Sequence, residues 1–281
     1  MEHLSILITG ASTGIGRDAA LTLSRHGHQV FAGVRKEADG ESLKKEVSTI
    51  IPVIIDVMKS EQINSAYGYI SKARVPGQKF CLVNNAGAAI AAPIEAVSLE
   101  DLRFQLEVNV ISVVAVTQKF LPWIRETQGR VVNMSSISGK ITRPYLGPYS
   151  ASKHAIEAIS DALRGEVKKF GVQVCIIEPG PIKTPIWEKG IGKAVDFLDK
   201  ASPELKKIYL EDATHMQKTI EKVVQSAAPV DLTTMAIVDA LTSKKPKIRY
   251  PVGNQVASTL KIRKHLSDRA FDWLMDLRYG R

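Results

Sequence analysis

The sequence has few cysteines, few aromatic residues and no long apolar run. Among its 281 residues, two are cysteines and 6% are aromatic. Cys81 and Cys175 lie in apolar, strand-like stretches, where a thiol usually acts as a small buried apolar group. No Cys/His spacing fits a metal site, and no apolar run reaches the ~18 residues that cross a bilayer. The polar start MEHLS lacks the form of a signal peptide, so we expect a reducing, cytoplasmic setting and no metal.

Positive charge is concentrated at one end of the chain. The formal net charge is +9, and the segment from Lys244 to Arg281 holds ten Lys/Arg against three Asp/Glu. The remaining 28 basic and 26 acidic residues nearly cancel. A basic end can bind an anionic membrane or nucleic acid, or it can form an ordinary charged exterior.

Strand-like and helix-like segments alternate through the first ~180 residues. This alternation predicts parallel strands joined by right-handed crossovers, and the apolar runs LSILIT and VCIIEP are typical of strands covered on both faces. The predicted fold is therefore a doubly wound α/β domain. The expected strands are Leu4–Thr9, Val30–Val34, Ile50–Ile55, Phe80–Val83, Arg130–Met134 and Val172–Ile177. The expected helices are Ile15–Arg25, Ser60–Arg74, Leu99–Thr117 and Tyr149–Phe170.

The pattern changes after Thr184. Residues Pro185–Val224 are helical but poorly patterned, Ala228–Leu241 is a clearer helix, and Ile248–Val252 is a candidate edge strand. A last helix over Leu260–Leu277 would place Leu266, Ala270, Trp273, Leu274 and Leu277 on one stripe. We expect a single domain over residues 1–255, with a variable segment at about 185–226, and a basic amphipathic helical extension over 256–281.

A glycine-rich turn joins the first strand to the first helix. Thr9–Gly16 reads TGASTGIG, with glycines at positions 10, 14 and 16. Glycines there allow a tight turn and a close approach of the backbone to a pyrophosphate at the helix N-terminus. The other interpretation is a glycine turn without a ligand, but its place after the first strand favours a nucleotide.

Several strand ends carry polar residues suited to the same ligand. Arg35, at the end of the second strand, suits the 2′-phosphate of NADP; the alternative is a solvated basic pair with Lys36. Asp56 would accept from an adenine amino group or serve as a turn residue. The amides of Asn84-Asn85 could tie neighbouring strands, and Asn109 is a poor helix former inside a predicted helix.

A serine, a tyrosine and a lysine are spaced for proton transfer. Ser136 precedes Tyr149 by thirteen residues, and Lys153 follows Tyr149 by four, which places phenol and ammonium on the same helix face. A nearby cation favours the phenolate, so we expect a lowered pKa for Tyr149. Taken alone the spacing is common and fits a solvated helix face.

Taken together, TGASTGIG, Asp56, NNAG, Asn109, Ser136, YSASK and the Pro179–Thr184 segment resemble the short-chain dehydrogenases/reductases over about residues 4–184. The resemblance implies a Rossmann-like sheet of about seven strands, a homodimer or homotetramer, and a catalytic tetrad of Asn109, Ser136, Tyr149 and Lys153. The expected cofactor is NADP(H), with NAD(H) as the alternative. We expect cofactor contacts from Gly10, Ser12, Thr13, Gly14, Ile15, Gly16, Arg35, Asp56, Val57, Asn85, Ala86, Gly87, Tyr149, Lys153, Pro179, Gly180, Ile182 and Thr184.

Apolar residues near the tetrad suggest a lipophilic alcohol or carbonyl substrate, contacted by Ser136, Tyr145, Tyr149 and Trp187. Core packing would explain the same apolar side chains equally well. VFAGVRK and the long C-terminal extension are similar to the steroid- and retinol-dehydrogenase-like subset. A regulator that binds cofactor without turnover is the second hypothesis. For the basic end, docking on the domain or a partner subunit competes with peripheral membrane contact, and nucleic acid is not expected.

Overall fold

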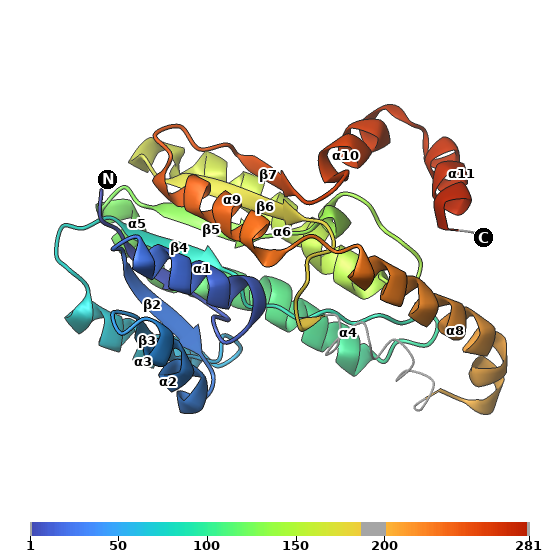
Figure 1. The fold of residues 1–281 in the computed structure, drawn as a ribbon, viewed down its shortest axis with the longest axis horizontal. Coiled ribbons are helices and arrows are strands. Elements are labelled where there is room, and N and C mark those ends of the chain that lie inside the picture. The colour runs from blue at the N-terminus through green and yellow to red at the C-terminus, as the bar shows by residue number, and fades with distance from the viewer. Residues whose placement is uncertain (1, 187–200, 280–281) are drawn as a thin grey trace.

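The computed structural model describes residues 2–186 and 201–279, and it contains one parallel sheet covered by helices on both faces (Figure 1). The strand order is β3-β2-β1-β4-β5-β6-β7, and every pairing is parallel. The predicted doubly wound fold of about seven strands is confirmed, including the edge strand near Ile248–Val252. The strands are β1 Ser5–Ile8, β2 Gln29–Val34, β3 Ile51–Ile54, β4 Phe80–Asn84, β5 Arg130–Met134, β6 Gln173–Pro179 and β7 Arg249–Val252.

Each face of the sheet has its own apolar core. On one face, helices α1 (Gly14–Arg25), α2 (Glu37–Glu46) and α9 (Val230–Thr242) bury residues such as Leu23, Leu43 and Ile237. On the other, α3 (Ser60–Ala73), α5 (Ser112–Glu126) and α6 (Gly147–Val167) bury residues such as Ile70 and Phe120. Burial on both faces explains why the strands are continuous apolar runs. Because both faces are covered, a ligand can reach the sheet only at its edges, and in open α/β sheets the site is formed by the loops at the carboxyl edge.

The helix expected over Leu99–Thr117 is longer and is interrupted. It comprises α4 (Leu99–Leu106), a π-helical turn η1 (Glu107–Ile111) and α5, which continues to Glu126. Asn109 lies in the π-helical turn, as its poor helix propensity indicated. Single π-turns inside α-helices are frequent at functional sites.

The C-terminal region differs from the sequence-based expectation. The single helix over Leu260–Leu277 is wrong, because α10 (Val256–His265) and α11 (Asp268–Tyr279) are separated at Leu266 and Ser267. Arg263 donates to the carbonyl of Leu266 at 3.2 Å, and the Ser267 hydroxyl accepts from the amide of Ala270 at 3.4 Å. These side-chain bonds satisfy backbone groups at the two helix ends and so stabilise the break.

The expected apolar stripe on that helix also divides. Leu266, Ala270 and Leu274 of that stripe are partly buried, and Phe271, which was not predicted to belong to it, is buried beneath the Arg263 guanidinium at 5.0 Å from the ring centroid. Trp273 and Leu277 are each 64% exposed. Figure 1 shows α10 and α11 at the margin of the molecule, beyond β7. Helix α8 (Pro203–Gln225), within the expected variable segment, begins at a Ser202 hydroxyl that accepts from the amide of Leu205.

The aromatic cluster beneath α5 gives a direct test of the core. Phe120 is fully buried, with its ring centroid 5.7 Å from that of Phe80 and 5.5 Å from that of Trp123. Phe120→Ala should lower the free energy of unfolding by about 3–5 kcal/mol, because it removes apolar contacts and leaves a cavity. Urea denaturation measures this loss. Tyr69→Ala, at a half-exposed position on α3, is the control, and equal losses for the two variants would contradict the assignment.

Candidate active site

Ser136, Tyr149 and Lys153 meet at the carboxyl edge of the sheet. Ser136 follows β5 and caps the short 3-10 helix η2 (Ile137–Gly139), whereas Tyr149 and Lys153 lie in the first two turns of α6. The Ser136 hydroxyl stands beside that of Tyr149, close enough to act on the pKa of the phenol. Lys153 Nζ donates to the carbonyl of Met134 at 2.7 Å and lies 5.7 Å from the centroid of the Tyr149 ring. A phenol, a hydroxyl and an amine are thus brought together as the spacing predicted.

The electrostatics of this group differ from the expected lowering of the tyrosine pKa. Burial raises the pKa of Tyr149, and the hydrogen bond with Ser136 opposes that shift only in part. Burial also lowers the pKa of Lys153 to about 8, against the charge of Glu157, which raises it. Because Lys153 Nζ is bound to a backbone carbonyl, it lies above the ring of Tyr149 instead of hydrogen-bonding its hydroxyl. In this arrangement Tyr149 is a protonated phenol, ready to donate.

Asn109 connects three elements behind this group. Its Oδ1 accepts from the amide of Ala88 at 2.9 Å, and its Nδ2 donates to the carbonyl of Ala88 at 2.9 Å and to the Ser152 hydroxyl at 3.0 Å. The side chain is buried. It therefore holds the loop after β4 against α6. Sequence reasoning missed Ser152, although this residue lies inside the YSASK segment.

The glycine-rich turn has the backbone that a pyrophosphate requires. Gly10 and Gly14 have φ of +66° and +57°, and a Cβ on Gly16 would lie 2.4 Å from the carbonyl oxygen of Gly10. Helix α1 begins at Gly14; Thr13 makes no side-chain cap to it within the described chain, and its first turn carries no acidic residue. An uncapped, uncharged helix N-terminus beside a glycine cradle fits an anionic phosphate group.

The asparagines after β4 tie the sheet together beneath that turn. Asn84 Nδ2 donates to Asn133 Oδ1 at 2.8 Å, which joins β4 to β5. Asn85 Nδ2 donates to the carbonyls of Thr9 and Gly10 at 3.0 and 3.1 Å, which joins β4 to the glycine turn. The predicted tying role of these amides is confirmed. Ala86 lies directly against Gly10, where a Cβ would come within 2.8 Å of the Ala86 Cα.

The two residues expected near the adenosine lie beyond neighbouring strands. Arg35 is exposed just past β2, at the start of α2. Asp56 follows β3, and its Oδ1 accepts from the amide of Met58 at 3.1 Å, which is the local turn contact proposed as its alternative role. Val57, beside it, is buried. Arg17 on α1 points elsewhere, because it pairs with Glu46 and Ser42.

The segment after β6 lies between Ser136 and the glycine turn. The Pro179 carbonyl accepts from the Ser136 hydroxyl at 3.3 Å, and Gly180 donates to the carbonyl of Val252 at 2.8 Å. Ile182 is buried and forms a β-bridge with Ala228. A Cβ on Gly14 would lie 3.3 Å from the Thr184 side chain, so Thr184 stands opposite the glycine turn.

An apolar cluster surrounds Tyr149. Leu146, Tyr149 and Ile186 pack on Ala89 and Ala91, which sequence reasoning missed although both lie within four residues of the end of NNAG. Tyr145, an expected substrate contact, has φ +66°, and its carbonyl accepts from Ala92 at 2.8 Å. Trp187, the other expected contact, lies outside the described residues.

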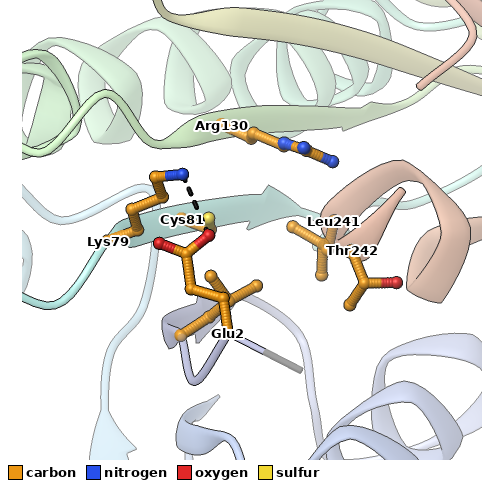
Figure 2. Close-up of a pocket in the computed structure, with 7 residues that line it drawn as sticks. Glu2, Lys79, Cys81, Arg130, Leu241 and Thr242 are labelled. Carbon is orange, nitrogen blue, oxygen red and sulfur yellow. Dashed lines mark hydrogen bonds and ion pairs between the residues drawn. The ribbon is translucent and has the colours of Figure 1, made fainter. Parts of the chain in front are cut away.

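A small opening at the amino-terminal edge of the sheet does not suit the predicted nucleotide binding and proton transfer (Figure 2). It lies at the amino ends of the strands, where Lys79 and Glu2 form an ion pair at 2.9 Å. Burial raises the pKa of the Cys81 thiol beside it to about 12, which keeps this thiol protonated and unreactive. Ligands of open α/β sheets bind at the carboxyl edge, where Tyr149 and the glycine turn meet.

The described part of the chain carries neither a membrane-spanning helix nor a group of metal-binding side chains. No helix there is long and apolar enough to cross a membrane. No group of three or more His, Cys, Asp or Glu side chains is placed to hold a metal ion among residues 2–186 and 201–279.

Comparison with known proteins agrees with this arrangement. A family model described as short chain dehydrogenase matches residues 5–194. An NADPH-dependent 3-dehydrocapnine reductase of Ornithobacterium rhinotracheale is 40% identical, with 88% of this chain and 87% of the relative covered. Human retinol dehydrogenase 16 is 34% identical, with 90% of this chain and 82% of the relative covered.

A short-chain dehydrogenase of Streptomyces avermitilis has a solved structure that superposes with a TM-score of 0.77 at 26% identity, covering 99% of this chain and 98% of that one. Relatives with retinol and hydroxysteroid dehydrogenase names also match most of the chain, as the similarity to that subset predicted. The chain belongs to the short-chain dehydrogenase/reductase family and is an oxidoreductase that uses a nicotinamide cofactor on CH–OH or carbonyl groups.

Proposed function

We propose that this protein is an NADP(H)-dependent oxidoreductase that interconverts a lipophilic alcohol and its ketone or aldehyde. The observation that carries the proposal is the meeting of Tyr149, Ser136 and Lys153 beside an apolar cluster at the carboxyl edge of the sheet, with Lys153 Nζ 5.7 Å from the centroid of the Tyr149 ring. The apolar neighbours Ala89, Ala91, Leu146 and Ile186 suit an apolar substrate. Two relatives named for retinol and for NADPH support the substrate class and the cofactor.

Tyr149 is the proton donor in this proposal. Its pKa is raised by burial, so the phenol is protonated at neutral pH and donates to a carbonyl oxygen during reduction. Ser136 holds the same oxygen, because its hydroxyl already contacts that of Tyr149. The bound nicotinamide would supply or accept the hydride.

Lys153 and Asn109 organise the proton path. Lys153 has a pKa near 8, so at neutral pH it is largely cationic and stabilises negative charge that develops on Tyr149. Asn109 fixes the loop after β4 against α6, through Ala88 and Ser152, and so positions the turn of α6 that carries Tyr149 and Lys153. The glycine turn, Asn85-Ala86-Gly87 and Pro179–Thr184 hold the cofactor by backbone contacts.

Removal of the Tyr149 hydroxyl tests this mechanism. Tyr149→Phe should lower kcat at least about 100-fold, because the proton donor is lost, while NADPH affinity changes little. Turnover is followed by nicotinamide absorbance with all-trans-retinal, hydroxysteroids and simple ketones. Tyr69→Phe, on the surface of α3, is the control and should keep the parent rate. Full turnover by Tyr149→Phe would remove the tyrosine from the mechanism.

Arg35 is proposed to select NADP(H) over NAD(H). It is exposed beyond β2, where a guanidinium can bind a 2′-phosphate in a bidentate manner. Arg35→Ala should weaken NADPH binding roughly 10-fold or more and leave NADH binding nearly unchanged. Arg25→Ala, an exposed arginine at the amino edge, is the matched control. Equal affinities of the parent protein for NADPH and NADH would overturn this role.

The basic C-terminal helices are proposed to mediate peripheral contact with an anionic membrane in a cytoplasmic homodimer or homotetramer. Trp273 and Leu277 are exposed on α11, which carries three Asp and two Arg, and the neighbouring α10 carries three Lys/Arg and no acidic residue. An exposed apolar surface close to cations can bind anionic lipid surfaces.

Vesicle binding tests this contact. Trp273→Ala combined with Leu277→Ala should lower binding to phosphatidylserine-containing vesicles several-fold, because both side chains would insert at the interface. The control is Ile208→Ala, an exposed residue on α8, and solution mass is measured in parallel. Unchanged binding of the double variant, or a parent that ignores vesicles, would contradict the membrane contact; a changed mass would assign the helices to subunit assembly.

A further inference from the structure

Two buried glutamates meet directly behind the catalytic turn of α6. Glu157 follows Lys153 by one helical turn and is 4% exposed, and Glu178 lies in β6 and is 2% exposed. The two carboxyl groups meet at one atom, because both lie within 3.4 Å of Arg249 Nε. Glu178 immediately precedes Pro179, whose carbonyl accepts from the Ser136 hydroxyl. The pair therefore bridges the two elements that carry the proton-transfer group.

The cations beside the two glutamates provide hydrogen-bond donors to only some of their carboxylate oxygens. Glu157 Oε2 contacts Lys140 Nζ at 2.9 Å and Arg249 Nε at 3.1 Å. Glu178 Oε1 lies 3.4 Å from the same Arg249 Nε, which carries one hydrogen and already donates it to Glu157. Glu157 Oε1 and Glu178 Oε1 are both buried without a hydrogen-bond donor in the described structure. Buried acceptors without a donor are costly.

We propose that Glu157 and Glu178 share one proton, and that this protonated pair is a positioning device that holds α6 and the end of β6 together beneath the active site. One proton between the two carboxyl groups supplies the missing donor and removes one of two adjacent negative charges. The inference that the pair supports catalysis rests on the proposed roles of Tyr149 and Ser136.

The charges around the pair favour a proton held near neutral pH. Burial and the charge of Glu157 raise the pKa of Glu178 to about 7, while Lys140 and Arg249 oppose that shift. Two further groups on α6 belong to this network. The charge of Glu157 raises the pKa of Lys153, and Asp161 forms an ion pair with Arg249 at 2.7 Å. Arg164 pairs with Asp161 on its outer side. Arg249 is thus shared among three carboxyl groups, those of Glu157, Glu178 and Asp161.

The packing leaves little room for the two carboxylates to separate. Gly139 of η2 lies against the same turn of α6: a Cβ there would come within 2.6 Å of the Ser135 hydroxyl and 3.1 Å of Glu157 Cγ. Loss of the shared proton would place two negative charges in contact, and their repulsion would push α6, η2 and β6 apart. The Ser136 and Pro179 contacts would loosen with them.

The sign of the pH dependence follows from the raised pKa. The folded protein binds the proton with a pKa of about 7, above the ordinary value of 4.5 for a glutamate. The stability that this proton confers is complete below that ordinary value and is lost as pH rises through about 7. Glutamine at position 178 offers an amide donor to Glu157 and does not titrate.

Glu178→Gln tests the shared proton without any need for a substrate. The melting temperature of the parent should fall relative to Glu178→Gln by about 5–10 °C between pH 5 and pH 8. The infrared spectrum of the parent at pH 6 should contain a protonated-carboxyl stretch that disappears in Glu178→Gln. Asp161→Asn also touches Arg249 but does not touch Glu178, and it should keep the pH dependence of the parent.

The positioning role has its own readout, the pH dependence of NADPH binding. NADPH affinity of the parent should fall about tenfold more than that of Glu178→Gln between pH 6 and pH 8, because the Pro179–Thr184 segment loosens. The shared proton would be overturned if the melting temperatures of the parent and of Glu178→Gln changed equally with pH and the parent showed no protonated-carboxyl stretch. If the proton is shared but NADPH affinity depends on pH in the same way in the parent and in Glu178→Gln, the positioning role would be overturned. Failure of the Tyr149→Phe prediction would leave both measurements intact and would reject only the catalytic assignment.

Discussion

The hydrogen bond from Lys153 Nζ to the carbonyl of Met134 fixes the start of α6 against the end of β5. It is buried, and a buried ammonium must find an acceptor, so the bond determines how α6 is rotated about its axis. That rotation directs the Tyr149 hydroxyl toward Ser136. Asn109 reinforces the same orientation from the other side by binding Ser152 and Ala88. The site thus depends on backbone acceptors at strand ends as much as on its own side chains.

The same burial sets the charges of the site. It raises the pKa of Tyr149, lowers that of Lys153 to about 8 and raises that of Glu178 to about 7. Desolvation disfavours the charged form in all three cases, so burial favours the uncharged phenol, amine and carboxyl. A proton donor and a cation of this kind are what carbonyl reduction near pH 7 requires.

The sequence predicts those features that depend on local pattern. Strands buried on both faces are recognisable as apolar runs, and the four-residue spacing of Tyr149 and Lys153 places them on one helix face. The exposed position of Arg35 follows from the end of β2. Long-range contacts escape this reasoning: the π-turn at Asn109 depends on Ala88, and the Glu157 pair depends on Arg249, 92 residues away. The break between α10 and α11 escapes it because a few side-chain bonds to the backbone outweigh a weak apolar periodicity.

The central claim is that the hydroxyl of Tyr149 faces the substrate oxygen, and the nicotinamide ring the reacting carbon, between the glycine turn and Pro179–Thr184. A crystal structure of the protein with NADP⁺ and a bound alcohol tests it most directly. The account predicts that the Tyr149 and Ser136 hydroxyls both lie within hydrogen-bonding distance of the alcohol oxygen, with the nicotinamide ring roughly 3–3.5 Å from the reacting carbon. A nicotinamide ring bound away from Tyr149, or a substrate oxygen held by other side chains, would contradict it.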